Sequence, residues 1–304
     1  MFGKLRPQLV EKIWGGENLG KKKGSIGLRP IGESLEVSRL EGVSSSYESQ
    51  SLDQILGERQ LPYLVKLIET QDYLSVQVHP GDHYAREHEN SSGKSECWVI
   101  LSCEENSGIY LGFKHGVKSH DFFKSLNKGE DITDYLSFYP VKKGDFFYVP
   151  SGAVHAIGKG ILLAEIQQSS GVTYRVWDWN RTDEKGNSRE LHVSKAKDVL
   201  NFDSFSNQKS HFKIKSDVLK QDISLIKQPD FELQILKVRG KKNLQTKSSR
   251  VISTLVLEGQ CNFFKEQKKL SLSQYESALL AGAGENLNIH IEGVDDENTL
   301  AIII

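Results

Sequence analysis

The chain has 304 residues, which is enough for about two domains of ~100–200 residues, each with its own hydrophobic core. Its 39 Lys and Arg nearly balance its 40 Asp and Glu, and the formal net charge of -1 argues against nucleic acid as a partner. No stretch approaches the ~20 apolar residues of a membrane span, so no membrane partner is expected. The 3 cysteines form no C-x-x-C pair, which predicts a cytoplasmic protein without a cysteine metal site.

Short segments of alternating apolar and polar residues dominate residues 60–180, and clusters of Gly, Asp, Asn and Ser separate them. This period of two predicts antiparallel strands in a sandwich or barrel. Near residues 115–139 the apolar spacing changes to three or four, which predicts a short helical insertion. The predicted strand segments are LPYLVKLIE, DYLSVQVHP, ECWVILSC, GDFFYVP, GILLAEIQ and TYRVWDW.

A polar connection rich in Ser and Lys follows at residues 200–229, and strand patterns resume after it. We therefore predict a larger domain at residues 1–228 and a smaller domain at residues 229–304. A weak internal repeat places Asn286 or a neighbour where the first copy has His155. Because imidazole is a common metal ligand, we expect a metal site at His155 in the first domain and none in the second.

The segment SVQVHP places Ser75, Gln77 and His79 on one face of a strand, because side chains alternate along a strand. Taken alone, such a polar face most often points to solvent. The segment therefore needs a second motif before it indicates a site.

That second motif is G-x5-P-x-G-x2-H at residues 144–155, in which Gly and Pro fix turns and His155 opens a returning strand. The spacing resembles the second motif of the cupin superfamily, whose jelly-roll barrels hold a divalent metal through inward His and Glu side chains. Gln77, His79 and Glu96 fit a variant of the superfamily's first motif. Two imidazoles and a carboxylate suit zinc or another first-row divalent ion.

The chain also resembles one family within that superfamily, the type I mannose-6-phosphate isomerases in their short bacterial form. The resemblance implies two cupin-type jelly rolls in a mainly β fold and one zinc ion per chain. It implies the interconversion of D-mannose 6-phosphate and D-fructose 6-phosphate through a cis-enediol. The stretches that carry it are EKIWGG (11–16), GESLEVS (32–38), LVKLIE (64–69), LSVQVHPGD (74–82), GKSECWVIL (93–101), GDFFYVPSGAVHAIGKGILLAEIQQSS (144–170) and TYRVWDWNR (173–181).

The resemblance assigns roles to individual residues. Those it gives to zinc are Gln77, His79, Glu96 and His155. Those it gives to catalysis and substrate binding are Arg175, Lys94, Lys66 and Ser75, with Ser75 near the phosphate. A lysine transfers the proton only if burial beside the metal lowers its pKa; otherwise it pairs with phosphate, and the sequence leaves both roles open.

One departure and two alternatives remain. Gly171 stands where the family commonly has Asp, so a carboxylate that orients Arg175 is not carried over. This departure is the one feature that favours a non-catalytic sugar-phosphate-binding cupin. A cupin oxygenase with bound iron is the other alternative, but Lys66, Lys94 and Arg175 make a pocket better suited to a phosphate.

Overall fold

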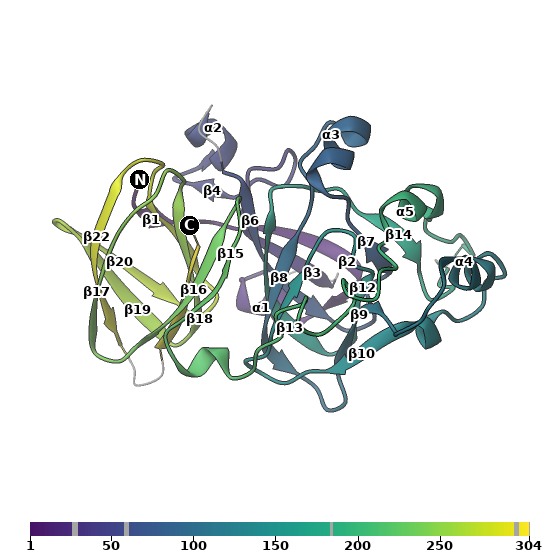
Figure 1. Cartoon of the computed structure of the whole chain (residues 1–304). Coiled ribbons are helices and arrows are strands. Elements are labelled where there is room, and N and C mark those ends of the chain that lie inside the picture. Colours follow the sequence, from purple (N-terminus) through teal and green to yellow (C-terminus); the bar gives the residue numbers. More distant parts are fainter. Residues whose placement is uncertain (26–29, 58–60, 183–184, 295–297, 304) are drawn as a thin grey trace.

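The computed structural model describes residues 1–25, 30–57, 61–182, 185–294 and 298–303. Two β-barrels, each made of two facing antiparallel sheets, lie side by side (Figure 1). The N-terminal barrel is coloured from purple to green, and the C-terminal barrel mainly from green to yellow. The prediction of a mainly β fold with two jelly-roll-like barrels and short helices is confirmed.

Every strand predicted within residues 60–180 lies in the N-terminal barrel. Its strands are β2 (Gln8–Gly16), β3 (Ile31–Val37), β6 (Tyr63–Thr70), β7 (Val76–Val78), β8 (Glu96–Cys103), β9 (Gly108–Phe113), β10 (Leu136–Pro140), β11 (Phe146–Val149), β12 (His155–Ile157), β13 (Ile161–Gln168) and β14 (Tyr174–Trp177). A six-stranded sheet has the order β11-β8-β13-β6-β2-β3, and a five-stranded sheet has the order β10-β9-β12-β7-β14.

The helices are short and lie outside the barrels. They are α1 (Asn18–Lys22), α2 (Leu52–Leu56), α3 (Asp82–Glu89), α4 (Ser119–Asn127) and α5 (Val193–Val199), with 3-10 turns η1 (Thr133–Tyr135) and η2 (Val218–Lys220). Within the predicted helical insertion, α4 and η1 are helical, but residues from Leu136 onward form β10. There Phe138 pairs with Tyr110 of β9, with their ring centroids 5.1 Å apart, and this aromatic cross-strand contact favours a strand.

The C-terminal barrel contains strands from both ends of the chain. Its strands are β1 (Gly3–Lys4), β15 (Ile223–Lys227), β16 (Glu232–Val238), β17 (Lys241–Lys247), β18 (Ile252–Glu258), β19 (Gln260–Lys265), β20 (Lys268–Ser273), β21 (Ser277–Ala281), β22 (Asn286–Gly293) and β23 (Asn298–Ile303). The sheet orders are β1-β21-β18-β23-β16-β15 and β17-β22-β19-β20, and β4 (Ser46–Tyr47) pairs separately with β5 (Gln50–Ser51). The domain boundary at residue 229 stays a prediction, and β1 and β15 cross it by pairing with the later strands.

Side chains alternate between two cores along the strands of the six-stranded sheet. On one face, Val65 and Leu67 of β6 and Val99 of β8 form a single buried cluster with residues of the C-terminal barrel such as Leu255. On the other face, Trp98 joins the apolar core inside the N-terminal barrel. Because of the same alternation, the polar side chains that lie between the residues of the first core point into the interior of the N-terminal barrel.

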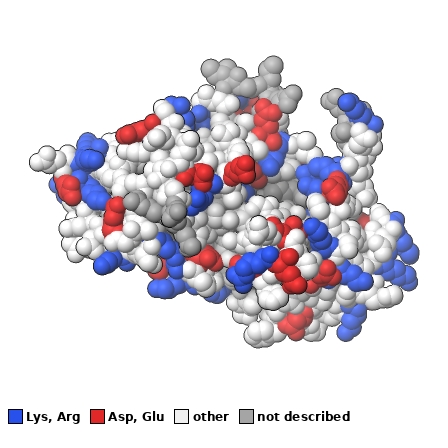
Figure 2. Space-filling view, turned by 90° about the horizontal axis from the view of Figure 1, so that it is seen from above, with Lys and Arg blue, Asp and Glu red and all other residues white. Residues whose placement is uncertain are grey.

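The surface carries charged side chains of both signs. On the face seen in Figure 2, acidic and basic side chains are interspersed. None of the described helices is long and apolar enough to cross a membrane.

Candidate active site

A row of polar side chains crosses the five-stranded sheet on its inner face. Gln77 of β7 is paired with His155 of β12 on one side and with Arg175 of β14 on the other. Directly paired residues of neighbouring strands share a face, so these three side chains lie next to one another. Polar strand faces are commonly exposed to solvent. This face is not, since Ser75 and His79 on it are buried.

Glu96, at the start of β8, approaches this row from the opposite sheet. Its carboxylate oxygens lie 3.4 Å from His79 Nε2 and 3.5 Å from His155 Nε2. The ligand atoms of all three residues fall within 4.8 Å of one another, and each residue is at most 1% exposed. Residues from three separate places in the sequence thus form one buried His–Glu–His cluster.

The two histidines present the atoms that a metal ion needs. His79 Nδ1 donates a hydrogen bond to the Val172 carbonyl at 3.0 Å, and His155 Nδ1 donates one to the Ala153 carbonyl at 2.9 Å. A carbonyl only accepts, so each Nε2 keeps its lone pair and faces Glu96. Burial lowers the pKa of His79 to about 3 and also lowers the pKa of His155, so both imidazoles are neutral at pH 7.

The carboxylate of Glu96 is also poised to bind a cation. Its Oε1 has no hydrogen-bond partner among the described residues, while its Oε2 lies next to the Lys94 ammonium. Burial alone would raise the pKa of Glu96, but the charge of Lys94 and the contact with His79 hold it well below its usual value. The Lys94 ammonium lies 2.9 Å from Glu96 Oε2 and 3.0 Å from His79 Nε2, so a cation already contacts two of the three proposed ligands.

Gln77 contacts the imidazole of His155. Its side-chain amide nitrogen is 3.2 Å from His155 Nε2, the atom that would face a metal. Turning this amide by 180° would place its oxygen there instead. The donor set of two neutral imidazoles, one carboxylate and one amide fits a first-row divalent ion.

A second buried charge group lies beside the first. Lys66 of β6 pairs in register with Glu165 of β13, and its ammonium is 3.4 Å from Glu165 and 3.8 Å from Glu33. Trp98 Nε1 donates a hydrogen bond to the other oxygen of Glu165 at 3.1 Å. Burial alone would lower the pKa of Lys66, but the charges of Glu33 and Glu165 raise it. The structure therefore gives Lys66 a pKa shift opposite to the one that proton transfer requires.

Sequence reasoning missed the roles of Glu33 and Glu165. The structure pairs both carboxylates with Lys66. A signal was present, because Glu165 interrupts the apolar run GILLAEIQ at a position that alternation places inside the barrel.

Arg175 is half-buried at the edge of the five-stranded sheet. Its Nη1 donates a hydrogen bond to the Glu190 carbonyl at 2.6 Å, while its Nε is buried without a partner among the described residues. Burial, followed by the nearby charge of Arg189, lowers the pKa of Arg175.

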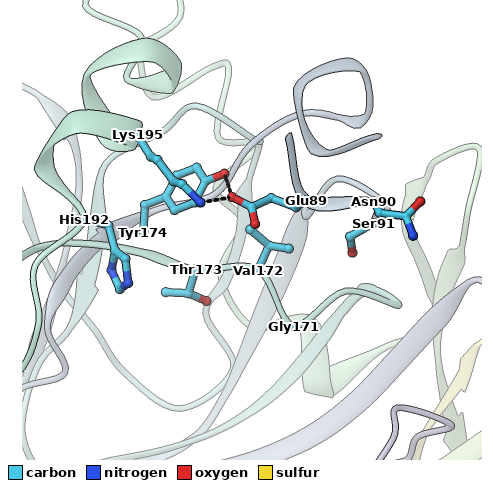
Figure 3. Close-up of a pocket in the computed structure, with 9 residues that line it drawn as sticks. All are labelled: Glu89, Asn90, Ser91, Gly171, Val172, Thr173, Tyr174, His192 and Lys195. Carbon is cyan, nitrogen blue, oxygen red and sulfur yellow. Dashed lines mark hydrogen bonds and ion pairs between the residues drawn. The ribbon is translucent and has the colours of Figure 1, made fainter. Parts of the chain in front are cut away.

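A pocket of about 430 Å³ lies between the end of α3 and the segment that leads into β14 (Figure 3). Val172, whose carbonyl binds His79, is part of its lining, and Glu89 joins Tyr174 and Lys195 in it through contacts of 2.7 Å. Gly171 also lines this pocket, and a Cβ placed on it would meet no atom within 4 Å. The absence of a side chain at residue 171 leaves this part of the pocket open.

Comparison with known proteins places the chain in a family. No family model matches it, but a mannose-6-phosphate isomerase of Streptococcus mutans is 37% identical over 283 residues, which is 88% of each chain. The chain belongs to the mannose-6-phosphate isomerase family. The mannose-6-phosphate isomerase ManA of Bacillus subtilis is 38% identical over 213 residues, or 64% of this chain and 67% of that protein. The resemblance predicted from the motifs is confirmed.

Solved structures agree with this assignment. The mannose 6-phosphate isomerase of Bacillus subtilis superimposes with a TM-score of 0.83 at 27% identity, covering 100% of this chain and 99% of that one. A mannose 6-phosphate isomerase bound with zinc and yttrium gives a TM-score of 0.73 at 14% identity, over 99% and 98% of the two chains. At that identity, the second match supports the fold alone.

The pairing of Lys66 with two buried carboxylates leads to a stability prediction. Lys66→Met should lower the free energy of unfolding by about 3–5 kcal/mol, because it leaves buried charge uncompensated. Urea unfolding at pH 7 measures this. Adding Glu165→Gln should recover part of the loss, whereas Lys241→Met, which breaks an exposed pair with Glu292, should have little effect. Equal effects of Lys66→Met and Lys241→Met would contradict the prediction.

Proposed function

We propose that this protein interconverts D-mannose 6-phosphate and D-fructose 6-phosphate with one bound zinc ion. The observation that carries the proposal is the buried cluster of His79, Glu96 and His155, in a member of this family. One carboxylate oxygen of the cluster, Glu96 Oε1, has no hydrogen-bond partner among the described residues. Gln77 is the fourth residue that we propose to hold zinc. When bound, the ion polarises substrate oxygens and stabilises negative charge on them.

The reaction moves a proton between two neighbouring carbons through a cis-enediol, so it needs a positive environment and a proton carrier. Arg175 supplies a fixed cation whose unpartnered Nε is free to donate to a substrate oxygen. Lys66 supplies a second positive charge, and its ion pairs keep it protonated. Lys94 is the better candidate for proton transfer, because its ammonium lies at the cluster itself.

Ser75 is the residue that we propose for the phosphate group. It is buried, and it lies two residues before Gln77 on the same face, roughly 7 Å along the strand. That separation suits a substrate whose reacting carbons face the metal while its phosphate lies further along the barrel. Lys94 is the second proposed substrate contact. We also infer a cytoplasmic location, since Cys97 and Cys103 form no disulfide.

A test of the proposal is turnover of mannose 6-phosphate by the purified protein, by the protein after chelation, and after zinc is added back. Chelation should lower turnover by at least about 10²-fold, and zinc should restore it. Metal content is measured alongside.

Two results would favour the alternatives. Bound metal without turnover in all three samples would favour a sugar-phosphate-binding protein, and Gly171→Asp would then be the next variant to examine. Bound iron with uptake of dioxygen would favour an oxygenase.

A further inference from the structure

The chain returns to Arg175 after leaving the end of β14. His192 lies 17 residues after Arg175, yet its backbone N–H donates to the Arg175 carbonyl at 2.7 Å. Its Nδ1 accepts a hydrogen bond from the Arg175 N–H at 3.1 Å. Residues 190–192 therefore run along the free edge of β14, next to the proposed catalytic arginine.

Asp178 fixes this returning segment. It is 5% exposed, and both of its carboxylate oxygens accept hydrogen bonds from Arg189, through Nε at 2.7 Å and through Nη2. Arg181 adds a further bond to Asp178 at 2.6 Å. Burial alone would raise the pKa of Asp178, but the hydrogen bonds from the two arginines lower it, so the carboxylate is ionised at neutral pH. A two-bond pair of this kind fixes orientation as well as distance.

Glu190, which follows Arg189 in the chain, binds the guanidinium of Arg175. The Glu190 carbonyl accepts the 2.6 Å hydrogen bond from Arg175 Nη1. The charge of Arg189 repels Arg175, so this bond persists only if the Glu190 carbonyl is kept in place. With Nη1 fixed, the buried Nε has no partner among the described side chains and is left for a substrate oxygen.

We propose that Asp178 and Arg189 form a clasp that positions the Arg175 guanidinium through the carbonyl oxygen of Glu190. This inference rests on the proposed function, in which Arg175 acts on the substrate. Asp178 and Arg189 are positioning residues, since they act through Arg175.

A double-mutant cycle tests the clasp. Arg189→Ala should lower kcat by about 10²-fold with little change in KM or zinc content, because a misplacement of about 1 Å has that effect. Arg189→Lys keeps the charge but loses the two-bond geometry, so it should recover only part of the rate. In an Arg175→Ala background, Arg189→Ala should have no further effect. Independent, additive losses would overturn the proposal.

The matched control is Arg39→Ala. Arg39 also bonds one aspartate, Asp53, and one backbone carbonyl, that of Gly57, and we assign it no part in the site. We expect kcat to stay within about twofold of the parent value. If Arg189→Ala fails to fold, Asp178→Asn tests the same contact.

Hydrogen exchange gives a readout that does not depend on activity. The amides of Arg175 and His192 should exchange at least about tenfold faster in Arg189→Ala than in the parent protein or in Arg39→Ala. Unchanged exchange would overturn the clasp. If the parent protein is inactive on mannose 6-phosphate, the proposed function fails, and faster exchange would still support the clasp.

Discussion

Replacement of His155 by alanine is expected to abolish retention of the divalent metal and to lower turnover by about 10³-fold. The variant loses one of two neutral imidazoles that face Glu96, and the remaining donors no longer enclose a cation. A bound metal contributes several kcal/mol of charge stabilisation, and each ~1.4 kcal/mol corresponds to a tenfold change in rate. Metal analysis and a mannose 6-phosphate assay on the same sample measure both effects.

The chain should still fold in this variant, because an apolar core fills the barrel around the site. His290→Ala is the matched control. His290 lies on the C-terminal barrel, where its Nδ1 contacts Asn243 at 2.8 Å. The His290→Ala variant should keep both metal and activity. Full activity in His155→Ala would show that the metal site is assigned wrongly.

Replacement of Arg175 by alanine should leave zinc bound but lower kcat by about 10²–10³-fold. The guanidinium is fixed on one side by the Glu190 carbonyl and has a buried Nε with no partner in the described chain. Such a fixed cation stabilises negative charge as it develops, with little reorganisation during the reaction.

Steady-state kinetics with metal analysis separates the possible roles of Arg175. A loss confined to KM would indicate that it binds the substrate without assisting the chemical step. Loss of zinc together with activity would indicate a structural role at the cluster. Arg175→Lys keeps the charge without the planar group, and it should recover only part of the lost rate.

The sequence predicted well what local patterns determine. Alternation in SVQVHP places Gln77 and His79 on one face, and the turn residues around β11 bring His155 beside them. These patterns were sufficient to group the proposed ligands, because side-chain direction in a strand follows directly from position.

Long-range pairing is what the sequence did not reveal. The contact between Lys66 and Glu165 depends on the register of β6 against β13, which no local pattern specifies. The pKa of Lys66 is raised by two carboxylates, which lie on separate strands. The strand at Leu136 was also misjudged, since its pairing with β9 is formed only in the folded chain.

The pairing of the first strand has a consequence for biosynthesis. Gly3 of β1 pairs with Leu279 of β21, so this strand is held by a partner that is translated long after it. During translation, β1 must stay unpaired until β21 has left the ribosome. Because such distant contacts form late, we expect the N-terminal barrel to fold first and β1 to join the C-terminal barrel in a slower step.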